Sequence, residues 1–270
     1  MKINQFEIID RCLFWPEKKI LIVADIHLGY EEYLNELGWT FPKTQFEVTE
    51  KIFEKIFEKV GKVSKIIILG DIKHHIGGIL REEFGDFYKI TNLFRKNLVE
   101  NGEIIITKGD HDKILEPVIR NYSFVKLVNY YKLDNLMFFH GNKKDFDKYQ
   151  LEIFDTQKKS KDFDHTPKKL KEKQESFNTS TGCLVIGHFH PAIIIGQDSK
   201  RERYKCFLLG KIKKYNKNLI ILPSFFPLIE GTNILEEQLL ENWLNIDNFD
   251  VYVLDENENV YDFGKVKELR

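Results

Sequence analysis

The sequence predicts an α/β fold in which short buried strands alternate with amphipathic helices. Its apolar runs are short and rich in β-branched and aromatic residues, which is typical of strands rather than helices. Longer segments between the first runs repeat apolar residues at helical spacing. Late in the chain, apolar runs flank short polar turns, which indicates hairpins.

Each strand is expected where an apolar run is bounded by polar or turn-forming residues. One late hairpin is expected to join Ala192–Gly196 to Tyr204–Gly210, and another to join Asp250–Leu254 to Val260–Phe263. The other predicted strands are Ile20–Ala24, Lys65–Leu69, Glu103–Thr107, Asn135–Phe139, Cys183–Ile186 and Leu219–Leu222.

Two helices are expected between the early strands. Lys43–Val60 has an apolar face that includes Phe53, and Gly61 follows it as a suitable C-cap. Leu80–Glu100 has the same spacing of apolar residues and stops at Asn101–Gly102.

The composition bounds the class of protein. A chain of 270 residues can bury one large core, and we expect residues 1–270 to form a single domain. The formal net charge is -1, so the chain as a whole does not attract nucleic acid, and any binding to it would need local basic groups. Three widely separated cysteines argue against a disulfide framework. Because we find no membrane-spanning run and no signal-peptide pattern, we expect a cytoplasmic protein with no membrane partner.

Residues 142–180 differ in composition from the rest of the chain. They are dense in Lys, Asp, Glu and Gln and have few apolar residues. We expect a charged, mobile insertion with one or two exposed helices. A substrate-facing lid or an interaction arm is the alternative, and composition alone does not choose between them.

Five apolar runs lead directly into aspartate or histidine. In α/β proteins the C-terminal ends of strands bring together side chains from distant parts of the chain. We therefore expect these side chains to meet at one site. They are Asp25, His27, Asp71, Asp110, His140, His188 and His190.

These side chains predict a binuclear metal site. Three buried carboxylates and four imidazoles would be costly without partners, because desolvation of each charge costs several kcal/mol. A pair of divalent cations would remove that cost. A mixture of Asp and His favours transition metals over an all-oxygen calcium site. We expect two divalent metal ions, with Mn²⁺ first and Ni²⁺, Zn²⁺, Fe²⁺ or Mg²⁺ as alternatives.

The spacing of the candidate ligands predicts how they point. Asp25 and His27 are expected on one strand, where residues i and i+2 project to the same side. The same argument aligns His188 with His190. Glycines beside these motifs are expected to form tight turns that let a metal ion approach closely.

Taken in order, the motifs D-x-H, G-D, G-D-H-D, H-G and G-H-x-H resemble those of the calcineurin-like metallophosphoesterases, from Ile20 through Pro191. A narrower resemblance is to archaeal phosphoesterases related to the SbcD nuclease and to bacterial ligase-associated phosphodiesterases. It rests on Trp15–Pro16, Ala24–Pro42, GDIKH, GHFHP and Leu222–Ile234. The resemblance implies a four-layer sandwich of two mixed β-sheets packed together and flanked by helices.

The resemblance also implies a role for each matching residue. One metal ion would be held by Asp25, His27 and His190, the other by Asp110, His140 and His188, with Asp71 between them. His111 would face the phosphate without binding metal, and would stabilise its charge or protonate the leaving oxygen. The implied reaction is phosphodiester hydrolysis by a hydroxide that bridges the two metal ions.

One position departs from the family pattern, because the family's G-N-H-D reads G-D-H-D here. Asp110 keeps an oxygen that can bind metal but adds a negative charge. We therefore expect tighter metal binding and weaker Lewis acidity than asparagine would give at this position.

The stretch GDIKHHIGG bears on the substrate. Serine/threonine phosphatases of this superfamily have GDxxDRG there, and the arginine binds the phosphate. The absence of that arginine favours a singly charged phosphodiester over a phosphoprotein. His74, at the position of the second aspartate, is expected either to hydrogen-bond the substrate or to orient Asp71. His75 and His165 are expected at the surface.

Several functions stay open at this point. The narrower resemblance favours a nuclease-like phosphodiesterase that acts on DNA or RNA. An enzyme for a small nucleotide or metabolite is one alternative, and a catalytically blunted metal-binding interaction module is another. The sequence does not choose an oligomeric state.

Overall fold

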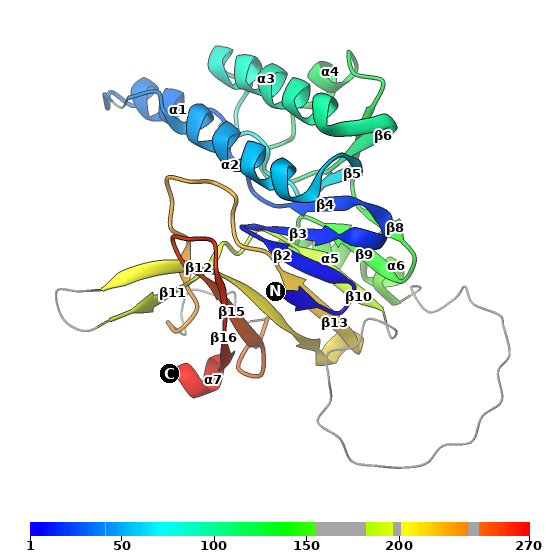
Figure 1. Cartoon of the computed structure of the whole chain (residues 1–270), viewed down its shortest axis with the longest axis vertical. Helices are drawn as coiled ribbons and strands as arrows, with labels where there is room; N and C mark the ends of the chain where they lie inside the picture. Colours follow the sequence, from blue (N-terminus) through cyan, green and yellow to red (C-terminus); the bar gives the residue numbers. More distant parts are fainter. Residues whose placement is uncertain (41, 155–181, 197–200, 237–242) are drawn as a thin grey trace, which may run out of the picture.

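The computed structural model describes residues 1–40, 42–154, 182–196, 201–236 and 243–270. In it, two mixed β-sheets pack against each other and helices cover their outer faces (Figure 1). The α/β sandwich implied by the family resemblance is confirmed.

The first sheet has seven strands in the order β1-β2-β3-β4-β5-β6-β7. Strands β4 to β7 run parallel, whereas β1 to β4 are joined antiparallel. Their bounds are β1 Lys2–Ile3, β2 Phe6–Ile9, β3 Cys12–Trp15, β4 Ile20–Val23, β5 Val63–Ile68, β6 Leu98–Thr107 and β7 Val125–Val128.

The second sheet has nine strands, seven of them in the order β14-β11-β12-β13-β10-β9-β8. Strand β15 pairs with β12, and β16 pairs with β15. Strands β9, β10 and β13 run parallel. The bounds are β8 Tyr131–Leu133, β9 Leu136–Phe139, β10 Cys183–Ile186, β11 Pro191–Ile195, β12 Glu202–Ile212, β13 Lys217–Ile221, β14 Thr232–Asn233, β15 Asp250–Leu254 and β16 Val260–Lys265.

Helices α2 and α3 cover the outer face of the first sheet, above it in Figure 1. The α-helices are α1 Tyr30–Glu36, α2 Gln45–Val60, α3 Arg81–Asn97, α4 Glu116–Ile119, α5 Lys143–Lys148, α6 Gln150–Phe154 and α7 Val266–Leu269. Two short 3-10 helices lie at Pro16–Lys18 and Lys213–Tyr215.

Alternate residues of the strands fill cores on opposite faces of each sheet. In β4, Leu21 and Val23 pack towards the helices, whereas Ile20 and Ile22 pack between the two sheets. A third core lies on the outer face of the second sheet. The strands are apolar on both faces because both faces are covered.

The predicted strands and both predicted helices are present, with ends shifted by a few residues. Both predicted hairpins pair antiparallel, as β11 with β12 and as β15 with β16. The strands β1 to β3, β7, β8 and β14 and the short helices α1, α4 and α7 were not predicted from the sequence.

Residues 142–154 form two helices, α5 and α6, in agreement with the helices expected in the insertion 142–180. The expectation that this part is solvated is wrong, because Phe146, Tyr149 and Ile153 are buried in the core outside the second sheet. Their spacing of three and four residues brings them to the same core despite the high local charge. The remainder of the segment, 155–181, lies outside the described residues.

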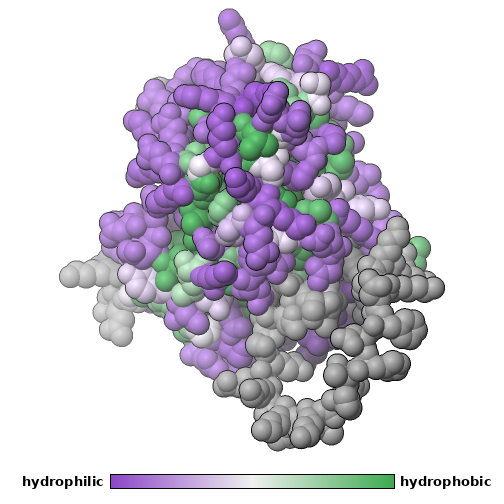
Figure 2. Space-filling model, turned by 45° about the vertical axis from the view of Figure 1, so that its right-hand side comes forward, coloured by the Kyte–Doolittle hydropathy of each residue, from purple (hydrophilic) through white to green (hydrophobic). Residues whose placement is uncertain are grey.

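Hydrophilic side chains cover most of the face of the molecule that Figure 2 shows. None of the helices in the described ranges is long and apolar enough to cross a membrane. The three cysteines are buried and unpaired, as their number and spacing predicted.

Candidate metal centre

The predicted ligands follow parallel strands of both sheets, so they converge where the C-terminal ends of those strands meet. The ligands lie after β4 (Asp25 and His27), β5 (Asp71), β6 (Asp110), β9 (His140) and β10 (His188 and His190). His111 lies in the loop after β6.

The expectation that Asp25 and His27 lie on a strand is wrong, because β4 ends at Val23. Asp25 and His27 both have φ of 51°, in the left-handed region that non-glycine residues rarely adopt. His188 and His190, with φ of 69° and 45°, are in the same region. Each such conformation costs about 1–3 kcal/mol and is concentrated at functional sites.

Asp25, His27 and His190 form the first cluster, in which the ligand atoms lie within 4.8 Å of one another. The two Nε2 atoms of His27 and His190 are 3.4 Å apart, and His190 Nε2 is 3.4 Å from Asp25 Oδ1. In the described part of the chain, this buried Oδ1 has no hydrogen-bond donor. An unpaired carboxylate oxygen that faces two imidazole nitrogens fits a bound divalent cation.

Asp110, His140 and His188 form the second cluster, again within 4.8 Å. His188 Nδ1 is 3.0 Å from His140 Nε2, and both nitrogens are 3.9 Å from Asp110 Oδ2. His140 Nδ1 lies 3.0 Å from the carbonyl oxygen of Leu69. Because a carbonyl only accepts, Nδ1 carries the proton and Nε2 is free to bind a metal ion.

Asp71 lies between the two clusters. It groups with Asp25 and His140 within 4.8 Å, and its Oδ2 is 3.4 Å from His140 Nε2. Its Oδ1 accepts a hydrogen bond of 2.9 Å from the backbone N–H of His111. This is where the family resemblance expects a residue shared by two metal ions.

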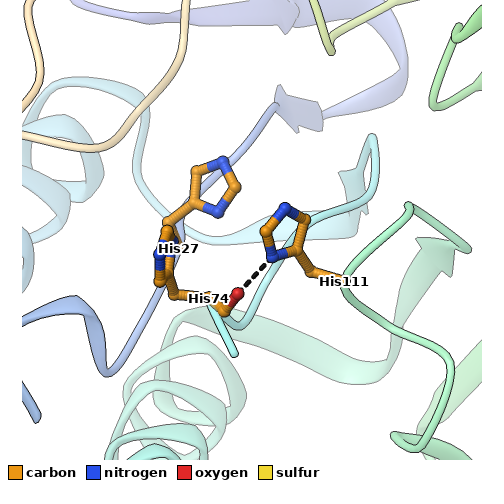
Figure 3. A group of neighbouring side chains, drawn as sticks. All are labelled: His27, His74 and His111. Atoms are coloured by element: carbon orange, nitrogen blue, oxygen red, sulfur yellow. Dashed lines mark hydrogen bonds between the residues drawn. The ribbon is translucent and has the colours of Figure 1, made fainter. Parts of the chain in front are cut away.

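His111 lies at the edge of the centre and is oriented by His74. Figure 3 shows His111 Nδ1 bonded to the backbone carbonyl of His74, which fixes the proton on Nδ1. The other nitrogen, Nε2, is 3.9 Å from Asp71 Oδ2. His74 therefore orients His111 through its backbone carbonyl.

The ring of His74 packs among other rings. Its centroid is 4.7 Å from that of Tyr30 and 5.3 Å from that of His27. Its Nδ1 is buried and has no hydrogen-bond partner in the residues that the structure describes. His75, expected at the surface, is half-buried and its Nδ1 accepts the N–H of Gly78 at 3.1 Å. His165 lies outside the described residues.

The sequence analysis missed Asn142, which supports the second cluster. Its Nδ2 is 3.0 Å from both carboxylate oxygens of Asp110. Its Oδ1 accepts the N–H of Asp145 at 2.9 Å and so caps α5. An asparagine directly after the H-G motif, just before a helix, was the available signal for the cap but not for the contact with Asp110.

Asp112, the last residue of the G-D-H-D motif, was missed as well. It is fully buried and accepts N–H bonds from Ile72 at 3.1 Å and from Gly109 at 3.0 Å. It thereby ties the loop after β5 to the loop after β6. Burial, together with the nearby charge of Asp71, raises the pKa of Asp112 to about 6.

The glycines beside the motifs leave room for carboxylates. A Cβ on Gly109 would overlap Asp71 Oδ1, and a Cβ on Gly187 would overlap Asp25 Oδ2. These two glycines let the aspartates pack closely against the backbone.

The histidines differ in their pKa. Burial, together with His190, holds the pKa of His27 well below its usual value. Burial, together with His140, lowers the pKa of His188 to about 4. Burial alone would lower the pKa of His140, but the charges of Asp71 and Asp25 outweigh it and raise this pKa to about 9. Without metal, His140 is therefore the protonated partner of the buried aspartates.

Comparisons with known proteins agree with this architecture. No curated protein matches the chain. Among solved structures, the nuclease MPE of Pseudomonas putida is 16% identical, and the match covers 97% of this chain and 98% of that one with a TM-score of 0.57. A protein of unknown function from Aquifex aeolicus is 14% identical over 67% of this chain and 81% of that one, with a TM-score of 0.36. At 16% identity, the likeness to the Pseudomonas putida nuclease shows the fold alone.

The family model for calcineurin-like phosphoesterases matches residues 18–254. This range includes every candidate ligand described above. Members of this family are metal-dependent hydrolases of phosphoesters, and the two Asp/His clusters have the donors that such a site needs. The chain belongs to the calcineurin-like phosphoesterase family.

Proposed function

We propose that this protein hydrolyses phosphodiester bonds, in nucleic acid first, with two divalent metal ions. The observation that carries the proposal is the pair of clusters, each with one aspartate and two histidines, on either side of Asp71. The proposed ligands are Asp25, His27 and His190 for one ion, Asp110, His140 and His188 for the other, and Asp71 for both.

The residues of the centre would bind the metal ions, and their neighbours hold the ligands in orientation. Two divalent ions held there would supply positive charge for the phosphate and a nucleophile at neutral pH. Leu69 orients the ring of His140 through its carbonyl, and the backbone N–H of His111 orients Asp71. These contacts hold the donors in place before substrate arrives.

His111 is proposed to deliver a proton to the leaving oxygen. With Nδ1 bonded to the His74 carbonyl, Nε2 is the atom left to hold that proton. Positioned acid catalysis of this kind contributes ~10²–10⁴ in rate. His74 is proposed to act on the reaction by positioning His111 through its backbone carbonyl.

The preference for a diester rests on the surroundings of His111. Among the residues of the described chain that line the pocket beside His111, none is an arginine or a lysine that would grip a dianionic monoester. The shared fold with a Pseudomonas putida nuclease supports nucleic acid as the substrate. Kinship with the SbcD-related and ligase-associated enzymes, Mn²⁺ as the native metal, a cytoplasmic location and one domain over residues 1–270 belong to the same proposal.

The experiment is metal-dependent hydrolysis after chelation. Purified protein is given Mn²⁺, Ni²⁺, Zn²⁺ or Mg²⁺ and tested on bis(4-nitrophenyl) phosphate, 4-nitrophenyl phosphate and single-stranded DNA. We expect cleavage of the diester and of DNA that chelator removes. Activity on the monoester alone would contradict the proposed substrate class.

Asp71→Asn is the decisive variant. It should abolish hydrolysis and lower the bound metal, whereas Asp147→Asn, an exposed aspartate of α5, should leave both unchanged. Two bound metal ions with no hydrolysis of any substrate would instead support a metal-binding interaction module.

A further inference from the structure

A small pocket opens beside His111. It has a volume of about 180 Å³ and is lined by Tyr33, His74, His75, Ile76, Gly77 and His111. Whole small-molecule sites are larger, roughly 300–1,000 Å³. The pocket therefore fits one group of a substrate rather than an entire ligand.

The lining of the pocket is aromatic and uncharged apart from imidazoles. The ring of Tyr33 lies 5.1 Å from that of His74 and 5.9 Å from that of His75, centroid to centroid. Ile76, 55% exposed, adds an apolar side chain at the rim. None of the described lining residues is a carboxylate, lysine or arginine, so the lining favours a flat, uncharged ring.

Buried hydrogen bonds hold this pocket in shape. Glu83, almost completely buried on α3, accepts N–H bonds from His74 at 3.1 Å and from His75 at 2.6 Å. It also accepts the N–H of Leu80 at 2.9 Å, at the far end of the same loop. A loop held at both ends by one carboxylate is ordered before any ligand binds, which lowers the entropic cost of binding.

We propose that this pocket binds the nucleobase on the leaving-group side of the scissile phosphodiester. The inference rests on the proposed function, in which His111 protonates the leaving oxygen. His74 and His111 line the pocket, and the carbonyl of His74 holds the ring of His111. The group that departs with the protonated oxygen thus lies beside Tyr33, where any base stacks because every base has a flat aromatic face.

The kinetic test uses thymidylyl-thymidine and two analogues that lack one thymine or the other. Loss of the leaving-side base should lower kcat/KM about tenfold, the scale of one stacking contact, and loss of the other base should matter less. Tyr33→Leu should remove this difference, and Tyr33→Phe should keep it. Tyr88→Leu is the matched control, because Tyr88 is 55% exposed and lies outside the pocket.

A binding test is independent of catalysis. Protein that carries Zn²⁺ is titrated with thymidine and with deoxyribose and followed by NMR. Thymidine alone should shift the backbone amides of Ile76 and Gly77, and Ile76→Asp, a change at the exposed rim, should abolish the shift.

The two tests separate the two proposals. No hydrolysis of any diester would overturn the proposed function. The thymidine titration would still test whether the pocket binds a base. Equal responses to thymidine and deoxyribose, or an unchanged base preference in folded Tyr33→Leu, would overturn the base-binding pocket.

Discussion

The two ligand clusters have the same donors, one aspartate and two histidines, but lie in different surroundings. The side chain of Asp25 in the first cluster is 0% exposed, whereas that of Asp110 in the second is 41% exposed. Asp25 Oδ2 accepts a backbone N–H, that of His188, at 2.9 Å. Asp110 is held by the side-chain amide of Asn142.

This difference shows two ways to orient a ligand. In the first cluster a backbone donor does it, and the carbonyl oxygen of Asp25 accepts bonds of 3.1 Å from the hydroxyl of Ser224 and the N–H of Phe226. The orientation of Asp25 in the first cluster is therefore fixed mainly by the backbone. In the second cluster, the single side chain of Asn142 orients Asp110. We therefore expect substitutions around the second cluster to be tolerated more easily.

Asp25→Asn should have the largest effect of the substitutions that compare the clusters. It removes a buried charge that lies near both His190 and His140, at 3.4 and 3.7 Å. We expect hydrolysis to fall by about 10³-fold and the bound metal to fall by at least one equivalent. Steady-state kinetics and metal analysis measure the two effects.

Asp262→Asn, at an exposed aspartate of β16, is the control for that experiment. If Asp25→Asn kept near-normal turnover with two bound metal ions, the first cluster would not be a metal site.

The second cluster should release a proton when it binds metal. The pKa of His140, raised to about 9, means that its ring is protonated at pH 7 and must become neutral to bind. Metal affinity should therefore rise ~10-fold per pH unit, or ~100-fold from pH 7 to pH 9. In metal-free protein, the stability of the fold depends on pH in the opposite direction. The raised pKa stabilises the fold below about pH 6.5, and this contribution is lost as pH rises through 9.

Calorimetry in buffers of different ionisation enthalpy counts these protons. About one proton is expected at pH 7.5 when the wild-type protein takes up metal, because the pKa of His140 is raised whereas those of His27 and His188 are lowered. Metal binding without proton release would show that His140 is neutral.

Asp110→Asn should separate metal affinity from turnover. It removes one negative charge, so we expect affinity in the second cluster to fall about tenfold and turnover at saturating metal to rise severalfold. Titration of metal followed by kinetics at saturation measures both. An unchanged turnover number would contradict the expectation that the extra carboxylate weakens the Lewis acidity of the metal ions.

Asn142→Ser should have the smallest effect. Serine still caps α5 but does not reach Asp110 with an amide, so stability should hold while metal affinity falls about tenfold or less. Asn142→Ala, which loses both roles, should also lower the melting temperature. Identical metal affinity in wild type and both variants would mean that Asn142 does not orient Asp110.

Much of the fold followed from local patterns. The strand Cys183–Ile186 was predicted with its observed ends, because four buried apolar residues between two glycines leave few other structures. The N-terminal strands were missed because they are short: β1 has two residues, and β2 and β3 have four each. Residues 142–154 were misjudged because their charge hides a narrow apolar stripe.

The sequence by itself determined which residues could be metal ligands. It also determined that these residues lie at the C-terminal ends of strands, where they can meet. These depend on the residue types and on hydrophobic periodicity, both of which are visible along the chain. Their roles as metal ligands stay predictions until metal is measured.

Only the tertiary structure decided how the donors are oriented. Asn142 meets Asp110 across 32 residues, and the carbonyl of His74 meets His111 across 37. The left-handed turns at Asp25 and His188 likewise replace the extended geometry that a D-x-H or H-x-H motif predicts. Such contacts depend on how loops from separate strands meet once two sheets have packed, and no local pattern encodes that meeting.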